Sequence, residues 1–114
     1  MVEISEADFA DLVDAALATI PPEFRDHMRN IAILIEDLHP SGPGVLGLYT
    51  GIPLPERQFG NAGYLPDTIT IYREALKRFC TSREQLAEQV RITVIHEVGH
   101  YFGFDDEELH ARGY

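Results

Sequence analysis

The sequence has a single cysteine and no long hydrophobic run. Cys80 cannot form a disulfide within the chain, which argues against a small disulfide-stabilised scaffold. We expect its side chain to be a small buried hydrophobic group. Every apolar stretch is far shorter than the roughly 18 residues of a membrane-spanning helix, and residues 1–6 lack the basic and apolar regions of an export signal. We therefore expect a cytoplasmic protein with no membrane partner.

Basic residues are scarce as well. Lysine and arginine total 9 against 19 for aspartate and glutamate, so the formal net charge is -10 at pH 7. A surface of this charge repels phosphate backbones, and we expect no nucleic-acid partner. The length of 114 residues and the hydrophobic content of 45% are ordinary for a globular protein, which predicts a single domain over residues 1–114.

The first third of the chain predicts a helix followed by a strand. Apolar residues recur at helical spacing over 9–20, with Ser5 as the N-cap and two prolines as the stop. A short helical segment is expected at 22–29. The run 31–35 is apolar on both alternating faces, which predicts a central strand covered on both sides.

Two further strands and a long loop are expected in the middle of the chain. Residues 45–49 follow a turn cluster and contain Gly47, which favours an edge strand. Residues 68–72 alternate polar and apolar side chains, as a half-buried strand does. Between these strands, residues 50–67 hold three prolines and three glycines, and a loop of this length usually lines a site.

The last long helix is predicted from Ser82 to about Phe102, after a shorter helix at 73–79. Ser82, with Gln85 three residues later, resembles the capping box that opens many helices. Gly103 is suited to the left-handed conformation that ends them. This helix carries the residues on which the functional prediction depends.

The pattern His-Glu-x-x-His occupies residues 96–100 of that helix. Residues four apart sit about 40° apart around a helix axis, so His96 and His100 point the same way and can bind one Zn²⁺. Glu97 stands about 100° from His96, which suits contact with a water beside the metal better than direct ligation. Zinc lowers the pKa of water toward ~7, so Glu97 is the predicted general base of a hydrolysis. The alternative is two surface histidines on a core helix.

A catalytic zinc needs a third protein ligand, which the segment after the second histidine must supply. Gly103 lets the backbone leave the helix and turn back toward the metal. Asp106 could instead be the first residue of a short final helix at 106–111, where it would favour the helix dipole. In order of preference, the candidates are Asp106 and His110, with Asp105 and Glu107 competing.

Two of the tail residues have a second possible role. His110 and Arg112 lie where a cation could stabilise a tetrahedral intermediate. An exposed helix end explains both residues equally well.

The string from His96 to Asp106, HEVGHYFGFDD, resembles the extended zinc motif of the metzincins, HExxHxxGxxH/D, in its Asp-terminated form. The resemblance puts Asp106 at the third-ligand position. Over its whole length, the chain is similar to the single-domain zincin-like metallopeptidases of bacteria. Membership implies an α+β fold of the minimal zincin type, in which a small mixed sheet of three to four strands packs on helices that include the one carrying the motif.

The resemblance also implies a substrate site. In zincins an antiparallel edge strand aligns an extended peptide beside the metal by β-augmentation. Residues 45–49 are the candidate for that strand, with Leu46, Gly47 and Leu48 making the contacts. The chain departs from the metzincins in that no methionine follows the motif and 14 residues follow His100. The resemblance therefore covers the metal site more fully than the substrate cleft.

These observations predict a zinc-dependent hydrolase that cleaves peptide bonds of a peptide or protein substrate. His96, His100 and Asp106 are the expected ligands of one zinc ion, and Glu97 is the expected base. The alternative is a zincin-fold metal-binding module that binds a partner without turnover. Hydrolysis of a phosphodiester is a third hypothesis, which the net charge of -10 disfavours.

Overall fold

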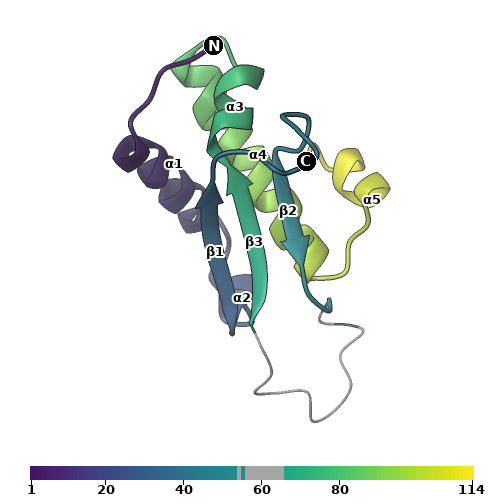
Figure 1. Ribbon diagram of the computed structural model, residues 1–114. Coiled ribbons are helices and arrows are strands. Elements are labelled where there is room, and N and C mark those ends of the chain that lie inside the picture. Colours follow the sequence, from purple (N-terminus) through teal and green to yellow (C-terminus); the bar gives the residue numbers. More distant parts are fainter. Residues whose placement is uncertain (54, 56–65) are drawn as a thin grey trace.

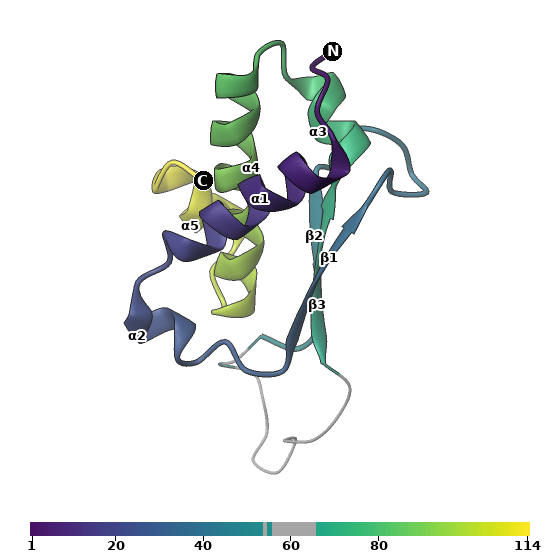
Figure 2. The ribbon, with the colours of Figure 1, turned by 90° about the vertical axis from the view of Figure 1, so that its left-hand side faces the viewer.

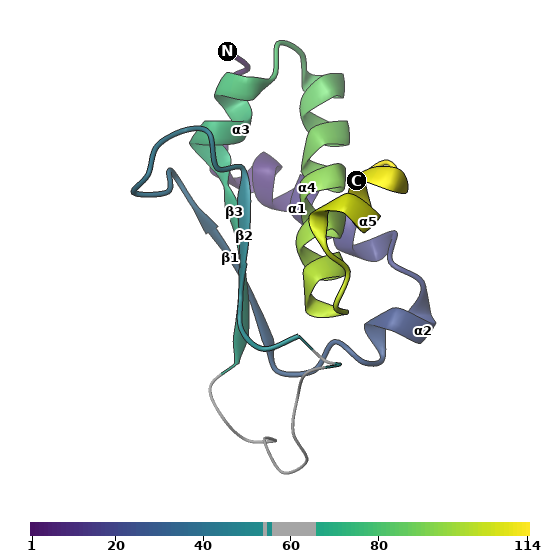
Figure 3. The same ribbon diagram turned by 90° about the vertical axis from the view of Figure 1, so that its right-hand side faces the viewer.

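The computed structural model describes residues 1–53, 55 and 66–114. Within them the strands form a mixed three-stranded sheet, and α1, α2, α4 and α5 lie to one side of it (Figures 1, 2 and 3). This arrangement confirms the prediction of an α+β fold with a small mixed sheet. None of the described helices is long and apolar enough to cross a membrane. The strands are β1 (Ile31–Glu36), β2 (Gly47–Thr50) and β3 (Asp67–Tyr72), and the helices are α1 (Glu6–Ala18), α2 (Pro22–Arg25), α3 (Arg73–Phe79), α4 (Arg83–Tyr101) and α5 (Asp106–Ala111).

β3 is the central strand of the sheet. It pairs in parallel with β1, where Ile69 lies opposite Ile33, and antiparallel with β2, where Ile69 lies opposite Tyr49. Ile69 and Ile71 are fully buried on the face toward the helices. The expectation of a half-buried strand at 68–72 is wrong, because Thr70 on the opposite face is buried too. A strand with a neighbour on each side loses exposure on both faces.

β1 and β2 form the two edges of the sheet. The edge position predicted for residues 45–49 is confirmed, although the strand begins at Gly47. The prediction that residues 31–35 form a central strand covered on both sides is wrong, since β1 has one neighbour and Leu34 and Ile35 are 44% and 37% exposed. A continuous apolar run indicates burial, but it does not tell how many layers the fold has to cover it.

The core lies between the sheet and the long helices α1 and α4. As predicted, Ser5 caps α1, and its hydroxyl accepts a hydrogen bond from the N–H of Asp8 at 3.0 Å. The short helix expected at 22–29 is α2, which ends earlier, at Arg25. The helix expected at 73–79 is α3. The fully buried core includes the predicted small hydrophobe Cys80 together with Phe9 from α1 and Val90 and Val94 from α4.

α4 begins where the sequence predicts. The Ser82 hydroxyl accepts a hydrogen bond from the N–H of Gln85 at 3.1 Å. The Gln85 side chain accepts from the N–H of Thr81 at 2.8 Å. The expected capping box therefore forms in one direction, and the second hydrogen bond goes to the preceding residue.

The end of α4 is also as predicted. Gly103 has a φ of +94°, in the left-handed region that favours glycine. The N–H groups of Gly103 and Phe104 donate back to the carbonyls of His100 and Gly99, each at 3.0 Å. This pair of hydrogen bonds closes the helix and turns the chain back along α4, where α5 follows.

Most of the loop expected to line a site, residues 50–67, lies outside the described residues. One described residue of it, Pro55, lies against the end of α4. A Cβ added at Gly103 would lie 2.7 Å from Cγ of Pro55. The turn that follows the predicted metal-binding helix is therefore sterically restricted to glycine as well as conformationally suited to it.

Candidate metal centre

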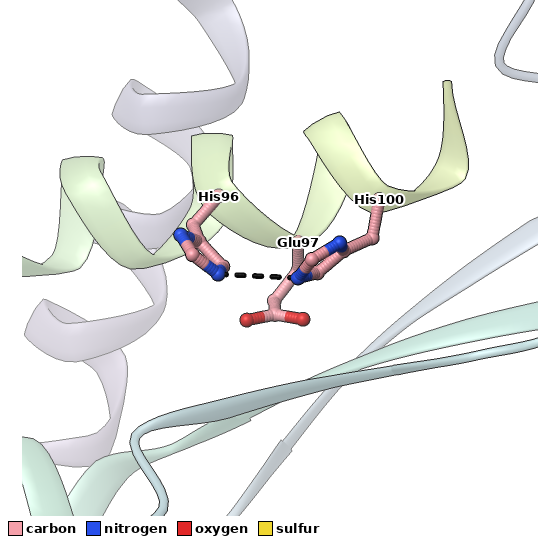
Figure 4. Close-up of side chains that lie close together, drawn as sticks. All are labelled: His96, Glu97 and His100. Atoms are coloured by element: carbon pink, nitrogen blue, oxygen red, sulfur yellow. Dashed lines mark hydrogen bonds between the residues drawn. The ribbon is translucent and has the colours of Figure 1, made fainter. Parts of the chain in front are cut away.

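His96 and His100 project from one face of α4, one turn apart, as their spacing predicts (Figure 4). Their Nε2 atoms lie 3.1 Å from each other. The ring centroids are 4.7 Å apart in an edge-to-face arrangement. The helix thus directs two imidazole nitrogens to one point in a cleft.

Asp106 reaches the same point from α5. Its Oδ1 atom lies 2.9 Å from Nε2 of His96 and 2.9 Å from Nε2 of His100. The neighbouring imidazoles, that of His96 most of all, lower the pKa of Asp106 and so favour the ionised carboxylate. Asp106 is also the first residue of α5, so the alternative position in a final helix is observed as well. Asp106 can begin α5 and also reach the histidines because the turn at Gly103 lays α5 beside α4 (Figure 3).

The other ring nitrogens indicate which tautomer each imidazole adopts. Nδ1 of His96 lies 3.1 Å from the carbonyl oxygen of Tyr114, and Nδ1 of His100 lies 2.9 Å from that of Phe104. A carbonyl oxygen only accepts hydrogen bonds, so each Nδ1 donates, and the Nε2 of a neutral imidazole then presents a lone pair. Two such lone pairs and a carboxylate oxygen converge, and a cation at their centre would stabilise this arrangement.

The donor atoms fit a zinc ion. Tetrahedral zinc, with bonds of about 2.0 to 2.1 Å, separates neighbouring ligand atoms by roughly 3.3 Å. The three separations between Nε2, Nε2 and Oδ1 are 2.9, 2.9 and 3.1 Å. Two histidines and one carboxylate are a ligand set of catalytic zinc, with a fourth position left for water or substrate. Donation from Nδ1 to main-chain carbonyls is the outer contact that orients metal-binding histidines.

The competing third-ligand candidates lie elsewhere. The Asp105 carboxylate caps α5 by accepting from the N–H of Glu108 at 2.8 Å, while the Glu108 side chain accepts from the N–H of Asp105 at 3.1 Å. The described residues that line the cleft do not include Glu107. His110 lines the cleft, but its ring centroid is 5.5 Å from that of His96 in a tilted stack. Its ring therefore lies beside the ring of His96.

Glu97 points from α4 toward the sheet (Figure 4). Its carboxylate forms a hydrogen bond with the main chain of Tyr49 in β2, and the residue is 8% exposed. Burial raises the pKa of Glu97 above its usual range, while His96, His100 and the hydrogen bond with Tyr49 act in the opposite direction. Ligand atoms of Glu97, His96 and His100 lie within 4.8 Å of one another, so these three could also hold a metal. The contact with Tyr49 favours Asp106 as the third ligand.

The cleft has α4 as its floor and two walls from distant parts of the chain. One wall is the segment 44–49, which includes most of β2, and the other is formed by Asp106, His110 and Tyr114. Figure 1 shows α5 beyond the β2 edge of the sheet. The cleft has a volume of about 640 Å³, within the usual range of ligand sites.

Two glycines let the walls approach the floor. A Cβ at Gly47 would lie 2.7 Å from Cγ2 of Thr93 and 3.2 Å from Cγ of Glu97. A Cβ at Gly99 would overlap the side chain of Leu109 in α5. Sequence reasoning missed the packing role of both glycines. A signal existed at Gly99, because a glycine inside a helix costs roughly 1 kcal/mol relative to alanine and so suggests a packing reason.

Sequence reasoning also missed the two carbonyl groups that accept from the histidines. The carbonyls of Phe104 and Tyr114 belong to the main chain, and every residue has such a group. The sequence therefore gives no signal of which carbonyls accept hydrogen bonds from the histidines. The sequence also offered Arg112 as a cation that could stabilise a tetrahedral intermediate. Its guanidinium lies over the ring of Phe104, with the guanidinium carbon 4.3 Å from the ring centroid.

Comparison with known proteins adds a family and a fold. The model of the family described as zincin-like metallopeptidase matches residues 28–114. Among solved structures, a conserved hypothetical protein from Thermus thermophilus is similar, with a TM-score of 0.60 and 24% sequence identity over 95% of this chain and 99% of that chain. At this identity the likeness shows the fold alone. No curated protein matches.

Proposed function

The chain belongs to the zincin-like metallopeptidase family, and on that premise we propose that it is a zinc-dependent peptidase. The matched residues, 28–114, include the sheet and the whole candidate metal centre. The observation that carries the proposal is the convergence of His96, His100 and Asp106 on one point. The buried carboxylate of Glu97 lies beside that point.

In this proposal His96, His100 and Asp106 hold one zinc ion through two Nε2 atoms and one Oδ1 atom. When bound, zinc supplies a Lewis acid that polarises a carbonyl oxygen and lowers the pKa of water toward ~7. The carbonyls of Phe104 and Tyr114 keep both imidazoles in the tautomer that leaves Nε2 available. These hydrogen bonds also limit rotation of the rings.

Glu97 acts as the general base. It takes a proton from water as the water oxygen forms a bond to the carbonyl carbon of the substrate. The same carboxyl then gives a proton to the amide nitrogen as the C–N bond breaks, which yields a carboxylic acid and an amine. Burial raises the pKa of Glu97 and so brings its proton affinity closer to neutral pH, which suits both transfers.

The edge of β2 that faces away from β3 is the place for the substrate. The carbonyl of Leu46 accepts from the N–H of Tyr72 at 3.0 Å, and antiparallel pairing alternates along the strand. The main-chain groups of Gly47 and Tyr49 therefore face away from β3, on the side of the cleft. Because Glu97 bonds to the main chain of Tyr49, Gly47 is the position where an extended peptide would pair.

Zinc content and peptide cleavage, measured on the same preparations, test the proposal. Wild-type protein should carry about one equivalent of zinc and cleave members of a quenched fluorescent peptide library. Glu97→Gln should keep its zinc and lose cleavage by roughly 100-fold or more. The double variant His96→Ala, His100→Ala should lose the zinc.

Three results would count against the proposal. Full activity in Glu97→Gln would overturn the mechanism. Zinc retained by the double histidine variant would overturn the metal centre. A zinc-loaded wild type that cleaves no member of the library would favour a metal-binding module without turnover.

A further inference from the structure

α5 carries a second side chain into the cleft. His110 follows Asp106 by four residues, so the two side chains sit about 40° apart around the axis of α5 and one turn along it. His110 lines the same cleft as the metal centre, and its ring lies 5.5 Å from that of His96 with the planes inclined by 36°. The side chain belongs to an exposed residue, so it is not sealed off from a molecule bound in the cleft.

α5 is anchored independently of His110. Leu109 is buried and packs directly on Gly99 of α4. A reciprocal capping box closes the first turn of α5. The ring of His110 is therefore held near His96 by neighbours that pack, while His110 itself is not part of the core.

Glu97 and His110 lie on opposite sides of the cleft. Glu97 bonds to the main chain of β2 on one wall, and His110 belongs to the α5 wall, with the ring of His96 next to it. A peptide carbonyl between the walls would have the base on one side and an imidazole on the other. Hydrolysis needs this difference, because the base serves the attacking water and a hydrogen-bond donor stabilises the oxygen that becomes negative.

We propose that His110 is a further catalytic residue, whose imidazole N–H donates a hydrogen bond to the carbonyl oxygen of the scissile bond as that oxygen gains negative charge. This inference rests on the proposed peptidase function and names its oxyanion donor. A neutral imidazole has one N–H, which is sufficient for the role. Proton transfer by His110 is not required.

The two other candidate donors of the tail are engaged elsewhere. Tyr114 bonds to Nδ1 of His96 through its carbonyl, and the guanidinium of Arg91 lies over its ring at 5.7 Å from the centroid. Arg112 packs on Phe104 and lines a separate apolar hollow on another side of α4. Tyr114 also lines the cleft, but its side chain forms a hydrogen bond with Arg91, so His110 is the tail side chain that both lines the cleft and places its ring beside that of a metal ligand.

Steady-state kinetics of three variants test the role. His110→Ala should lower kcat roughly 10- to 100-fold, with KM and zinc content unchanged, because the lost hydrogen bond forms in the transition state. His110→Gln keeps a side-chain N–H donor and should recover part of the loss. His27→Ala, which removes an exposed histidine outside the cleft, is the matched control and should behave as wild type.

Binding of a phosphinic peptide gives a readout that needs no turnover. The probe has the sequence of the library peptide that wild type cleaves fastest, with a tetrahedral phosphinate in place of the scissile amide. His110→Ala should weaken its binding by about the factor lost in kcat/KM. The same substitution added to Glu97→Gln should leave the affinity for the uncleaved parent peptide unchanged.

These outcomes distinguish failure of the oxyanion role of His110 from failure of the proposed peptidase function. Equal losses for the phosphinic and the parent peptide would mean ordinary substrate binding and would overturn the oxyanion role. Loss of zinc in His110→Ala would make His110 a metal ligand and would also overturn it. An active wild type with an equally active His110→Ala refutes the inference alone, whereas a zinc-loaded but inactive wild type refutes the proposed function and the inference with it.

Discussion

Leu109 packs on Gly99 so closely that a Cβ at position 99 would overlap its side chain. The contact joins α5 to α4 one residue before His100 and three residues after Asp106. It therefore sets the distance at which the carboxylate of α5 meets the imidazoles of α4. Of the two variable positions in the His-Glu-x-x-His pattern, the second, Gly99, therefore has to be small in this chain.

Gly99→Ala should weaken zinc binding about 10-fold or more, because the added methyl group pushes α5 away from α4. Overpacking typically costs ~1–3 kcal/mol, whereas the gain in helix propensity offsets roughly 1 kcal/mol. Zinc affinity, measured by competition with a chelator, is therefore a better readout than thermal stability. Leu109→Val shortens the opposing side chain, and the double variant should recover affinity. A double variant as weak as Gly99→Ala would contradict steric overlap as the cause.

Asp106→Asn should lower zinc affinity at least about 10-fold, the loss commonly seen even for outer contacts of a metal site. The neighbouring substitution Asp105→Asn is the matched control, because asparagine is also a good N-cap and should preserve α5. Zinc affinity of both variants is measured under the same conditions. If Asp105→Asn loses zinc and Asp106→Asn keeps it, the assignment of the third ligand is wrong.

Gly47→Ala should reduce peptide cleavage more than zinc binding. Its methyl group would lie 2.7 Å from Cγ2 of Thr93 and 3.2 Å from Cγ of Glu97, so the strand or the base has to move. A displacement of ~1 Å near the reacting atoms can cost roughly 100-fold in rate. Thr93→Ser removes the nearer methyl group, and adding it to Gly47→Ala should restore activity. Normal cleavage in the single variant would show that the approach of β2 to α4 is not critical.

Cys80 should make stability depend on alkaline pH, because burial raises the pKa of its thiol. Between the ordinary and the raised pKa the folded protein binds more protons than the unfolded chain, so the free energy of unfolding falls as pH rises through this window. Urea unfolding between about pH 7 and pH 10 should show a shallower decline for Cys80→Ala than for wild type. Identical slopes would mean that the thiol ionises in the folded protein as it does in the unfolded chain.

Much of the site follows from local sequence. The spacing of His96 and His100 is enough to place two imidazoles on one face, because helix geometry relates residues four apart without any tertiary contact. Ser82 and Gly103 mark the ends of α4 for equally local reasons, an available hydroxyl and a tolerance for positive φ. The family resemblance, which predicts Asp106 as the third ligand, also depends on the short string from His96 to Asp106.

Other parts could not be predicted from local patterns. The apolar run at 31–35 looked like a covered central strand, but whether a second layer covers a strand depends on the whole topology. The roles of Gly47 and of the Tyr114 carbonyl depend on contacts with residues far along the chain, and neither leaves a periodic signal.

Helix periodicity and capping were therefore sufficient for α4, the pair of histidines and the adjacent glutamate. Tertiary structure brought Asp106, rather than Asp105 or His110, into contact with both imidazoles, although the residues alone left these three neighbours in competition as the third ligand. The reason is physical: the choice depends on how α5 docks on α4 through Leu109 and Gly99, and on Asp105 being used as a cap. Tertiary structure also placed Glu97 against β2 and His110 on the opposite wall, and the proposed hydrolysis depends on this relationship.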